Sequence, residues 1–389
     1  MKRAWGGLLT VVILTILVAP LPAAAVVAET LPQDRVALDG VGFHLEGGEL
    51  EITPSVWGAG GAGEGLGPVV APSVSGPVTP AGGGLESADG LFEASFGAGA
   101  VDDDLTLTIA VPGADVPPHA GMIRIGDRVY DVTLEDDEGN PVTDFAGPVT
   151  LSFNFTAADL DGIDPADLRV FHFDEDLGAW VALPGSVDAG AGTVTATTDH
   201  LTLLALMHKE GMPRLLDVRG HWAEVAVLKL VSLDIISGYD DGTFRPAERV
   251  TREQFAKMVV LAMGLAPVAA PGPAFDDAGD ISPWAAGYVQ AAVEAEIIYG
   301  MDGNRFCPQA PVDRAQAAVM LIRALKIRPA AASTTFADDP AIPAWARGCV
   351  VEAAKRGIVT GFEDNTFRAD LTCDRAQAAA MIARFLAVP

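Results

Sequence analysis

Two kinds of hydrophobic periodicity divide this chain of 389 residues near residue 210. Between residues 91 and 207, apolar residues gather in short runs rich in β-branched and aromatic side chains, with Gly, Asp, Asn and Pro clusters between them. Such spacing is typical of antiparallel strands in a two-layer sandwich. The pattern therefore predicts an all-β sandwich over residues 86–208, with strands at 105–111, 122–125, 129–134, 149–155, 168–173, 180–183, 193–197 and 201–207.

After residue 213 the apolar residues take a helical spacing. Residues 222–233 place apolar side chains three and four positions apart, which indicates an amphipathic helix. The acidic turn at 238–242 should end it, with Gly238 in the left-handed conformation favoured at a helix C-terminus. A second helix is expected at residue 252, because Thr251 three residues before Gln254 forms a capping box.

The helical part repeats about every 61 residues. Each copy contains a tryptophan, followed at equal offsets by a glycine, a phenylalanine and an arginine. The tryptophans are Trp222, Trp284 and Trp345, the glycines Gly238, Gly300 and Gly361, the phenylalanines Phe244, Phe306 and Phe367, and the arginines Arg252, Arg314 and Arg375. Since one helix pair cannot bury its own apolar face, the repeats, at 212–265, 274–327 and 335–389, should pack together.

The N-terminal segment carries a secretion signal. Lys2 and Arg3 precede an apolar run at 8–18 and small residues up to residue 28, which is typical of a cleaved signal peptide and short for a bilayer crossing. We therefore expect residues 1–28 to be a signal peptide and the mature protein to have no membrane segment. Residues 29–85 should form a short strand region followed by a Gly/Pro-rich linker.

Charge and cysteine content narrow the function. The net charge of −27 excludes nucleic acid as a partner, because such binding needs a basic surface. Residues 29–209 contain 30 acidic and 5 basic residues, whereas residues 210–389 contain 22 acidic and 18 basic residues.

Three cysteines match neither a disulfide framework nor a zinc site, so buried thiols are favoured over one disulfide and one free thiol. The Asp-rich segment 159–167 should be a solvated turn rather than a calcium site.

The first repeat resembles S-layer homology domains. The resemblance rests on His221-Trp222-Ala223, on the run Gly-Tyr-Asp-Asp-Gly-Thr-Phe-Arg-Pro at 238–246 and on Thr-Arg-Glu-Gln at 251–254, and the repeats cover about 45% of the chain. It implies a C-terminal all-α domain with pseudo-threefold symmetry. Its inter-repeat grooves would bind a secondary cell-wall polysaccharide, often one bearing pyruvate ketals, with S-layer or other surface proteins as neighbours. The implied location is the cell wall or S-layer surface of a secreted protein.

An anionic polysaccharide offers flat C–H faces and carboxylates, which aromatic planes and arginine forks recognise. The three arginines sit in first helical turns, beside N–H groups expected to be free, and would bind the carboxylates of the polysaccharide. The alternative is that each arginine pairs with a neighbouring carboxylate side chain of the protein. The tryptophans are either sugar platforms or packing anchors. The three glycines lie at the ligand in the family. The second repeat departs most from the family pattern, and both later repeats replace the cap Thr by Asp.

No catalytic, cofactor or metal site is expected, so we predict a structural or interaction protein rather than an enzyme. The alternative is a carbohydrate-binding module or a scaffold of a surface enzyme system, which a row of exposed aromatic residues on the sandwich would favour. His200-Leu201-Thr202 also resembles the cleavage strand of self-cleaving sandwich domains, in which the histidine activates the hydroxyl. An ordinary strand is the favoured interpretation.

Overall fold

The computed structural model describes residues 35–38, 41–46, 49–54 and 72–388, with gaps at 113–115, 120, 270–271, 273, 302 and 330–331. The chain divides into two compact units, Met1–Val69 and Val70–Pro389. The expected signal peptide at 1–28 and residues 55–71 of the expected linker lie outside the described residues. Among the helices of the described ranges, none has the length and apolar character needed to span a bilayer.

The first unit contains one small antiparallel sheet. Its strands are β1 (Arg35–Leu38), β2 (Val41–Glu46) and β3 (Glu49–Pro54), in the order β1-β2-β3. The three strands account for the strand character of the sequence in this region.

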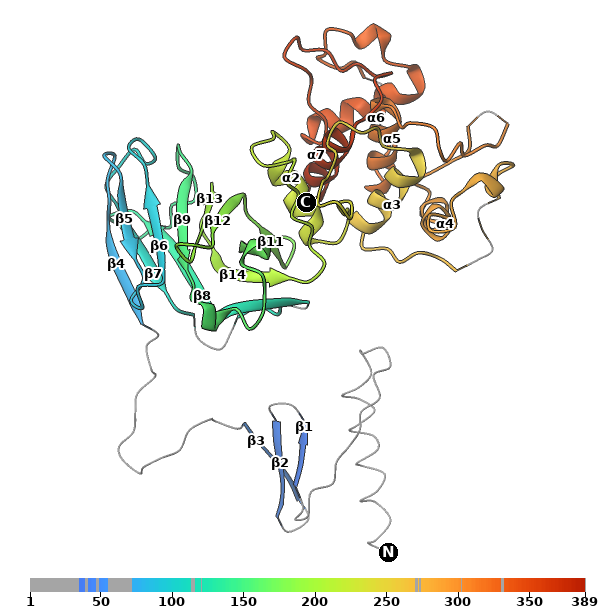
Figure 1. Ribbon diagram of the computed structural model, residues 1–389. Helices are drawn as coiled ribbons and strands as arrows, with labels where there is room; N and C mark the ends of the chain where they lie inside the picture. Colours follow the sequence, from blue (N-terminus) through green and yellow to red (C-terminus); the bar gives the residue numbers. More distant parts are fainter. Residues whose placement is uncertain are drawn as a thin grey trace, which may run out of the picture. The chain divides into compact units, whose positions relative to one another are not determined.

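The second unit begins with a sandwich of two antiparallel sheets (Figure 1). One sheet has the strand order β11-β10-β14-β8-β7-β4 and the other β12-β13-β9-β6-β5. The predicted all-β fold of this region is confirmed. The strands are β4 (Ser73–Val78), β5 (Gly83–Glu86), β6 (Phe92–Phe96), β7 (Leu105–Ala110), β8 (Met122–Glu135), β9 (Val149–Asn154), β10 (Leu168–Asp174), β11 (Ala179–Ala182), β12 (Gly185–Asp188), β13 (Thr193–Thr198) and β14 (Leu203–Lys209).

The sandwich begins earlier than its sequence indicates. Strands β4 and β5 lie inside the segment expected to be a linker, and each pairs with a strand of the sandwich, β4 with β7 and β5 with β6. Their composition, rich in Gly and Pro, conceals them, yet a Cβ on Gly83 would lie 2.9 Å from the carbonyl oxygen of Pro77. The glycine is therefore what allows two strands to approach closely here. The domain start expected at residue 86 moves to Ser73.

Aromatic side chains fill the space between the sheets. Phe92 stacks on Tyr130 with ring centroids 4.7 Å apart and contacts Phe153 at 4.6 Å. The Tyr130 hydroxyl donates to Asp89 Oδ2 at 2.8 Å, so the one polar group of this cluster is satisfied. Trp180, which is 2% exposed, does not belong to this cluster. It packs in a second hydrophobic core, which also contains residues of the helical part of the chain.

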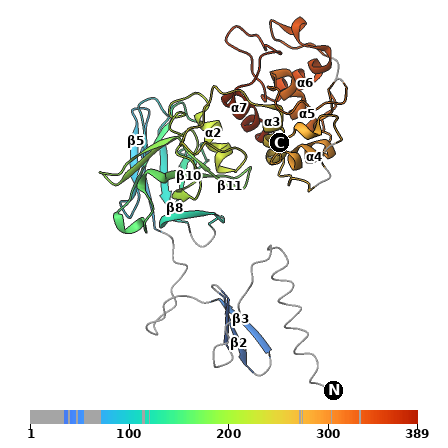
Figure 2. The same ribbon diagram turned by 45° about the vertical axis from the view of Figure 1, so that its right-hand side comes forward.

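The helical part closes on itself through the pairing of neighbouring repeats. The second helices of the repeats, α3, α5 and α7, pack against one another, and each first helix packs on the second helix of another repeat: α4 on α3, α6 on α5 and α2 on α7 (Figure 2). The helices are α2 (Glu224–Ser232), α3 (Arg252–Ala262), α4 (Ala286–Glu294), α5 (Arg314–Ala324), α6 (Ala344–Lys355) and α7 (Arg375–Leu386), with short 3-10 helices at Ala157–Asp159, Pro165–Asp167, Ala278–Asp280 and Asp339–Ala341.

Three main-chain hydrogen bonds form a ring where the repeats meet. The N–H of Val250 donates to the carbonyl oxygen of Cys373 at 3.0 Å, that of Cys373 to Val312 at 2.8 Å, and that of Val312 to Val250 at 2.9 Å. The three residues hold the same position in their repeats, two before the repeated arginine. The ring confirms the predicted pseudo-threefold all-α domain.

The first helix of the first repeat also packs on the sandwich. Helix α2 lies against β11, where the N–H of Ala182 donates to Ser232 Oγ at 2.9 Å. Lys229 forms an ion pair with Asp174 of β10 at 2.9 Å, and both side chains are largely buried. The sandwich and the helical domain therefore share one hydrophobic core at this junction.

Candidate functional site

The repeated arginine of each repeat reaches into another repeat. Its Nε donates at 2.8 Å to the carbonyl oxygen of the repeated phenylalanine there. The pairs are Arg252 with Phe306, Arg314 with Phe367, and Arg375 with Phe244. Each guanidinium also lies over the ring of the same phenylalanine, at 5.2, 4.8 and 4.3 Å from its centroid respectively. The arginines thus connect the repeats in a closed cycle.

These arginines are much less exposed than a first-turn position indicates. Arg252 and Arg314 are 4% and 6% exposed, and Arg375 is partly buried. Desolvation lowers the pKa of all three guanidinium groups. Their acceptors are carbonyl and amide oxygens rather than the carboxylates that the alternative interpretation required.

The first-turn N–H groups are not free for an anion, contrary to our expectation. The N–H of Arg252 donates to Ala310 at 2.9 Å and that of Glu253 to Pro308 at 3.1 Å. The equivalent groups of the other repeats make the same bonds, so the helix N-termini are satisfied by neighbouring chain. The full capping box occurs in the first repeat alone among the three. In the second repeat Gln316 accepts from Arg252 instead of returning to its cap.

Each arginine borders a groove between repeats, and we name the grooves by these residues. The first groove lies between Arg375, the loop 235–239 and helix α3. The second lies between Arg252, the loop 297–301 and helix α5. The third lies between Arg314, the loop 358–362 and helix α7. Pockets of about 200 and 420 Å³ occupy the first and second grooves.

The first groove combines two cations with aromatic rings. Arg375 donates from Nη2 to the carbonyl oxygen of Ser237 at 2.8 Å, and its guanidinium lies 5.1 Å from the ring centroid of Tyr239. Opposite, Lys257 Nζ lies 5.7 Å from the ring centroid of Trp284. A single pocket therefore presents positive charge beside a flat aromatic surface.

The second groove has two arginines. Arg252 donates from Nη1 to Gln316 Oε1 at 3.1 Å, and Arg323 lies 4.6 Å above the ring centroid of Tyr299. Trp345, from the next repeat, lines the same pocket.

The third groove, defined by its equivalence to the other two, is built around Arg314. Arg314 donates from Nη2 to the carbonyl oxygen of Thr360 at 2.8 Å, and its guanidinium lies 4.9 Å from the ring centroid of Phe362. Arg384 donates to the hydroxyl of the same threonine at 3.3 Å. The cations of this groove are thus partly occupied by its own loop.

The repeated tryptophans are surface residues. Trp222, Trp284 and Trp345 are 63%, 48% and 59% exposed. The repeated phenylalanines, at 0–1% exposure, are the packing anchors instead. Sequence reasoning left the tryptophans open between the two roles, and their exposure excludes the packing role.

The repeated glycines are needed for close packing rather than for a left-handed backbone. The left-handed residues at the ends of the first helices are Asp234, Glu296 and Gly357, not the glycines expected. A Cβ on Gly238 would lie 2.9 Å from the carbonyl oxygen of Thr243. On Gly300 it would lie 3.1 Å from Asn304 Oδ1, and on Gly361 3.0 Å from the ring of Phe336.

Two kinds of site residue were missed from the sequence. Lys257, Arg323 and Arg384 lie on the second helices, where sequence reasoning considered only the apolar face. The second kind is a carboxylate that holds the loop: Asp277 accepts from the N–H groups of Phe306 and Cys307, both at 2.7 Å, as Asp217 and Asp338 do in their repeats. Burial acts to raise the pKa of Asp277, but these donors outweigh it and hold the pKa below its usual value.

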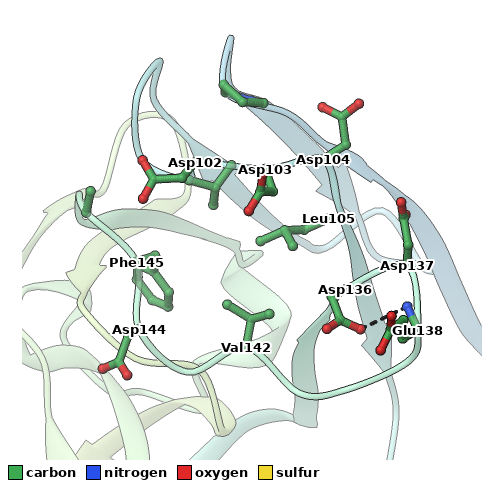
Figure 3. A pocket seen from close by; sticks show the side chains of 13 residues that line it. Asp102, Asp103, Asp104, Leu105, Asp136, Asp137, Glu138, Val142, Asp144 and Phe145 are labelled. Carbon is green, nitrogen blue, oxygen red and sulfur yellow. Dashed lines mark hydrogen bonds between the residues drawn. The ribbon is translucent and has the colours of Figure 1, made fainter.

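The sandwich carries a large acidic pocket of about 990 Å³ at one end (Figure 3). Asp102, Asp103 and Asp104 precede β7, and further carboxylates come from the connection between β8 and β9. Phe145 is the one aromatic residue among its lining, and Trp180 is buried. This pocket therefore lacks the row of exposed aromatic residues that a carbohydrate-binding module would present.

The segment His200-Leu201-Thr202 does not join a base to a nucleophile. His200 Nε2 lies 2.7 Å from His172 Nδ1, and its Nδ1 lies 3.0 Å from Asp199 Oδ1. The Thr202 hydroxyl donates instead to the carbonyl oxygen of Phe173 at 3.2 Å.

Neither a metal site nor a disulfide was expected from the sequence. No group of three or more His, Cys, Asp or Glu in the described ranges is arranged to hold a metal ion. Asp164 and Asp167 of the Asp-rich turn accept hydrogen bonds from Arg214. All three cysteines are free thiols, with Cys349 and Cys373 buried and Cys307 partly exposed.

Comparison with known proteins agrees with this geometry. The S-layer homology domain family matches residues 214–256, 274–318 and 335–379. Amylopullulanase of Thermoanaerobacterium thermosulfurigenes is 31% identical over 261 residues, which are 66% of this chain and 13% of that protein. Exoglucanase XynX of Acetivibrio thermocellus is 32% identical over 171 residues, or 43% of this chain and 16% of that protein.

S-layer protein EA1 of Bacillus anthracis is 33% identical over 109 residues, which are 28% of this chain and 12% of that protein. The chain thus spans less than a fifth of the length of each of these relatives. The match to the amylopullulanase, at 261 residues, is longer than the helical domain and therefore extends beyond it. The C-terminal part of the chain therefore consists of three S-layer homology repeats, and the protein is a secreted, cell-wall-associated surface protein.

Proposed function

We propose that the inter-repeat grooves bind an anionic secondary cell-wall polysaccharide, such as one carrying pyruvate ketals, and thereby hold the protein on the wall. One observation carries this proposal: the first and second grooves each place an arginine, partly buried in the first and buried in the second, and an exposed tryptophan from different repeats around one pocket. Binding would therefore need the assembled ring of repeats.

The chemistry of the grooves suits such a ligand. A ketal carboxylate would accept charge-assisted hydrogen bonds from the guanidinium of Arg375 or Arg252, each of which lines a pocket. The C–H face of a sugar would stack on Trp284 or Trp345. Since each guanidinium is already oriented by its carbonyl acceptor, little side-chain entropy would be lost on binding.

The predicted site residues take different roles in this proposal. The three arginines are ligands that also connect the repeats, and the three tryptophans are sugar platforms. Gly238, Gly300 and Gly361 allow the loops to approach closely enough to form the grooves. Lys257 and Arg323 add a second cation to the first and second grooves. We expect the third groove to bind least, because its second cation, Arg384, already donates to the Thr360 hydroxyl of the groove's own loop.

The acidic sandwich would be the part that is displayed, in a structural or interaction role rather than a catalytic one. A second candidate is a scaffold of a surface enzyme system, in which neighbouring S-layer or surface proteins are its partners. The match to the amylopullulanase favours this candidate, because it extends beyond the repeats into the preceding part of the chain.

Co-sedimentation with purified wall sacculi tests the proposal. The protein should bind sacculi that retain their secondary polymer and lose binding after the polymer is extracted with acid. The double variant Trp284→Ala, Trp345→Ala should bind at least about fivefold more weakly, since stacking contacts contribute about 0.5–1.5 kcal/mol each.

A matched control is Ile123→Ala, which removes an apolar side chain of similar exposure, 54%, on the sandwich. Its binding should equal that of the unchanged protein. Undiminished binding by the double tryptophan variant, or binding that survives polymer extraction, would overturn the proposal.

A further inference from the structure

The first helix of every repeat ends just before a groove. In the first and second repeats the residue after the helical cap is left-handed and acidic, Asp234 with φ 57° and Glu296 with φ 62°. The last carbonyl oxygens of such a helix have no donor within the helix and carry its negative end. A cation at this point would stabilise both the helix end and the loop that leaves it.

The second repeat supplies this cation itself. Lys326, which follows helix α5, donates from Nζ to the carbonyl oxygen of Ala295 and lies 3.8 Å from Glu296 Oε2. The first repeat has Gly264 at the position of Lys326, each 42 residues after the repeated tryptophan. The first repeat therefore has no lysine of its own at this point.

The sandwich provides a lysine at the same place. Lys209, the last residue of β14, donates from Nζ to the carbonyl oxygens of Ser232 at 2.6 Å and Val231 at 3.3 Å, and to Asp234 Oδ1 at 2.8 Å. It is 9% exposed, so its ammonium group depends on these acceptors. Two different parts of the chain thus place an ammonium group at equivalent helix ends.

The capped helix end leads directly into the first groove. The N–H of Ile235 donates back to the carbonyl oxygen of Leu230 at 2.9 Å, so the loop starts from the helix end. Ser237, two residues later, accepts from Arg375 and lines the pocket. The position of this loop therefore depends on contacts at both of its ends.

We infer that Lys209 is a positioning residue of the first groove, and that the sandwich completes the polysaccharide-binding domain instead of being only displayed by it. The consequence for binding rests on the proposed function. The effect on the loop does not.

The variant Lys209→Met in the full chain tests this, with hydrogen exchange as the first measurement. Amide exchange in the loop 235–239 should become about tenfold faster, as expected for the loss of about 1.4 kcal/mol of local stabilisation. The loop 297–301 of the second groove, which keeps Lys326, should exchange as before. In a Trp345→Ala background, which weakens the second groove, Lys209→Met should also reduce binding to wall sacculi severalfold.

Adding Gly264→Lys should rescue both readouts, since it restores the arrangement of the second repeat. A Cβ at Gly264 meets open space, and its φ of 66° is close to the 57° of Lys326. Asp234→Asn is a second variant, which leaves the buried Lys209 in place. Because the Asp234 side chain is exposed, this variant should still fold. It should also make amide exchange in the loop 235–239 faster.

Unchanged exchange in 235–239, or a uniform increase over the whole chain without rescue by Gly264→Lys, would overturn the inference. A local change in exchange with undiminished sacculi binding would overturn the role of Lys209 in binding. Failure of the unchanged protein to bind sacculi would instead overturn the proposed function, while exchange would still decide whether Lys209 positions the loop.

Discussion

The N–H of Val250 in the first repeat donates to the carbonyl oxygen of Cys373 in the third repeat, at 3.0 Å, and so closes a ring of three main-chain hydrogen bonds. Residues that are far apart in the sequence thereby occupy equivalent places where the second helices meet. The side chain of Cys373 is fully buried at this point.

Burial raises the pKa of the Cys373 thiol to about 12. We therefore expect Cys373 to resist alkylation by iodoacetamide at pH 8 in the folded protein and to react only after unfolding. Cys307, which is partly exposed, should be modified first. Mass spectrometry of peptides after timed labelling measures the order, and early modification of Cys373 would show that the ring opens readily.

Arg252→Ala should lower the free energy of unfolding by about 2–3 kcal/mol, because it removes charge-assisted hydrogen bonds and leaves the buried carbonyl oxygen of Phe306 without a donor. A first-turn arginine exposed on the surface would cost much less. Urea unfolding monitored by circular dichroism measures the difference. The matched control is Arg328→Ala, on an exposed arginine of the same domain, which should change stability by less than about 0.5 kcal/mol.

His172 should make the stability of the sandwich depend on pH. Burial, and then the neighbouring His200, lower the pKa of His172 to about 4 from the usual 6.5. Between these values the unfolded chain binds more protons than the folded one, so stability falls as the pH is lowered from about 6.5 to 4. Asp174 and Asp199 oppose this shift, and Lys229 supports it.

The contribution of His172 over this range should be no more than about 3.4 kcal/mol. His172→Phe should therefore flatten the dependence of the unfolding midpoint on pH between 6.5 and 4, relative to the unchanged protein. His208→Phe, on a partly exposed histidine of β14, serves as the comparison. An identical slope for His172→Phe and the unchanged protein would show that the fold does not lower the pKa of His172.

Short-range patterns in the sequence determined the main elements of this protein. The period of the repeats, the N-caps Thr251, Asp313 and Asp374, and most strands of the sandwich follow from residue spacing, because hydrogen bonds and apolar faces within one element involve neighbours a few residues apart. The repeated arginines, tryptophans and glycines were also identifiable as site candidates, since they recur at equal offsets.

Only the tertiary structure decided how these residues are used. The arginines are buried because each meets a carbonyl oxygen of another repeat, and the glycines are required because another segment approaches too closely for a Cβ. Strands β4 and β5 were missed because they owe their stability to partner strands rather than to their own composition. The contact of Lys209 with α2 likewise joins two domains. Each of these features depends on which distant segments meet, and the free energy of such contacts is not encoded in the local spacing of residues.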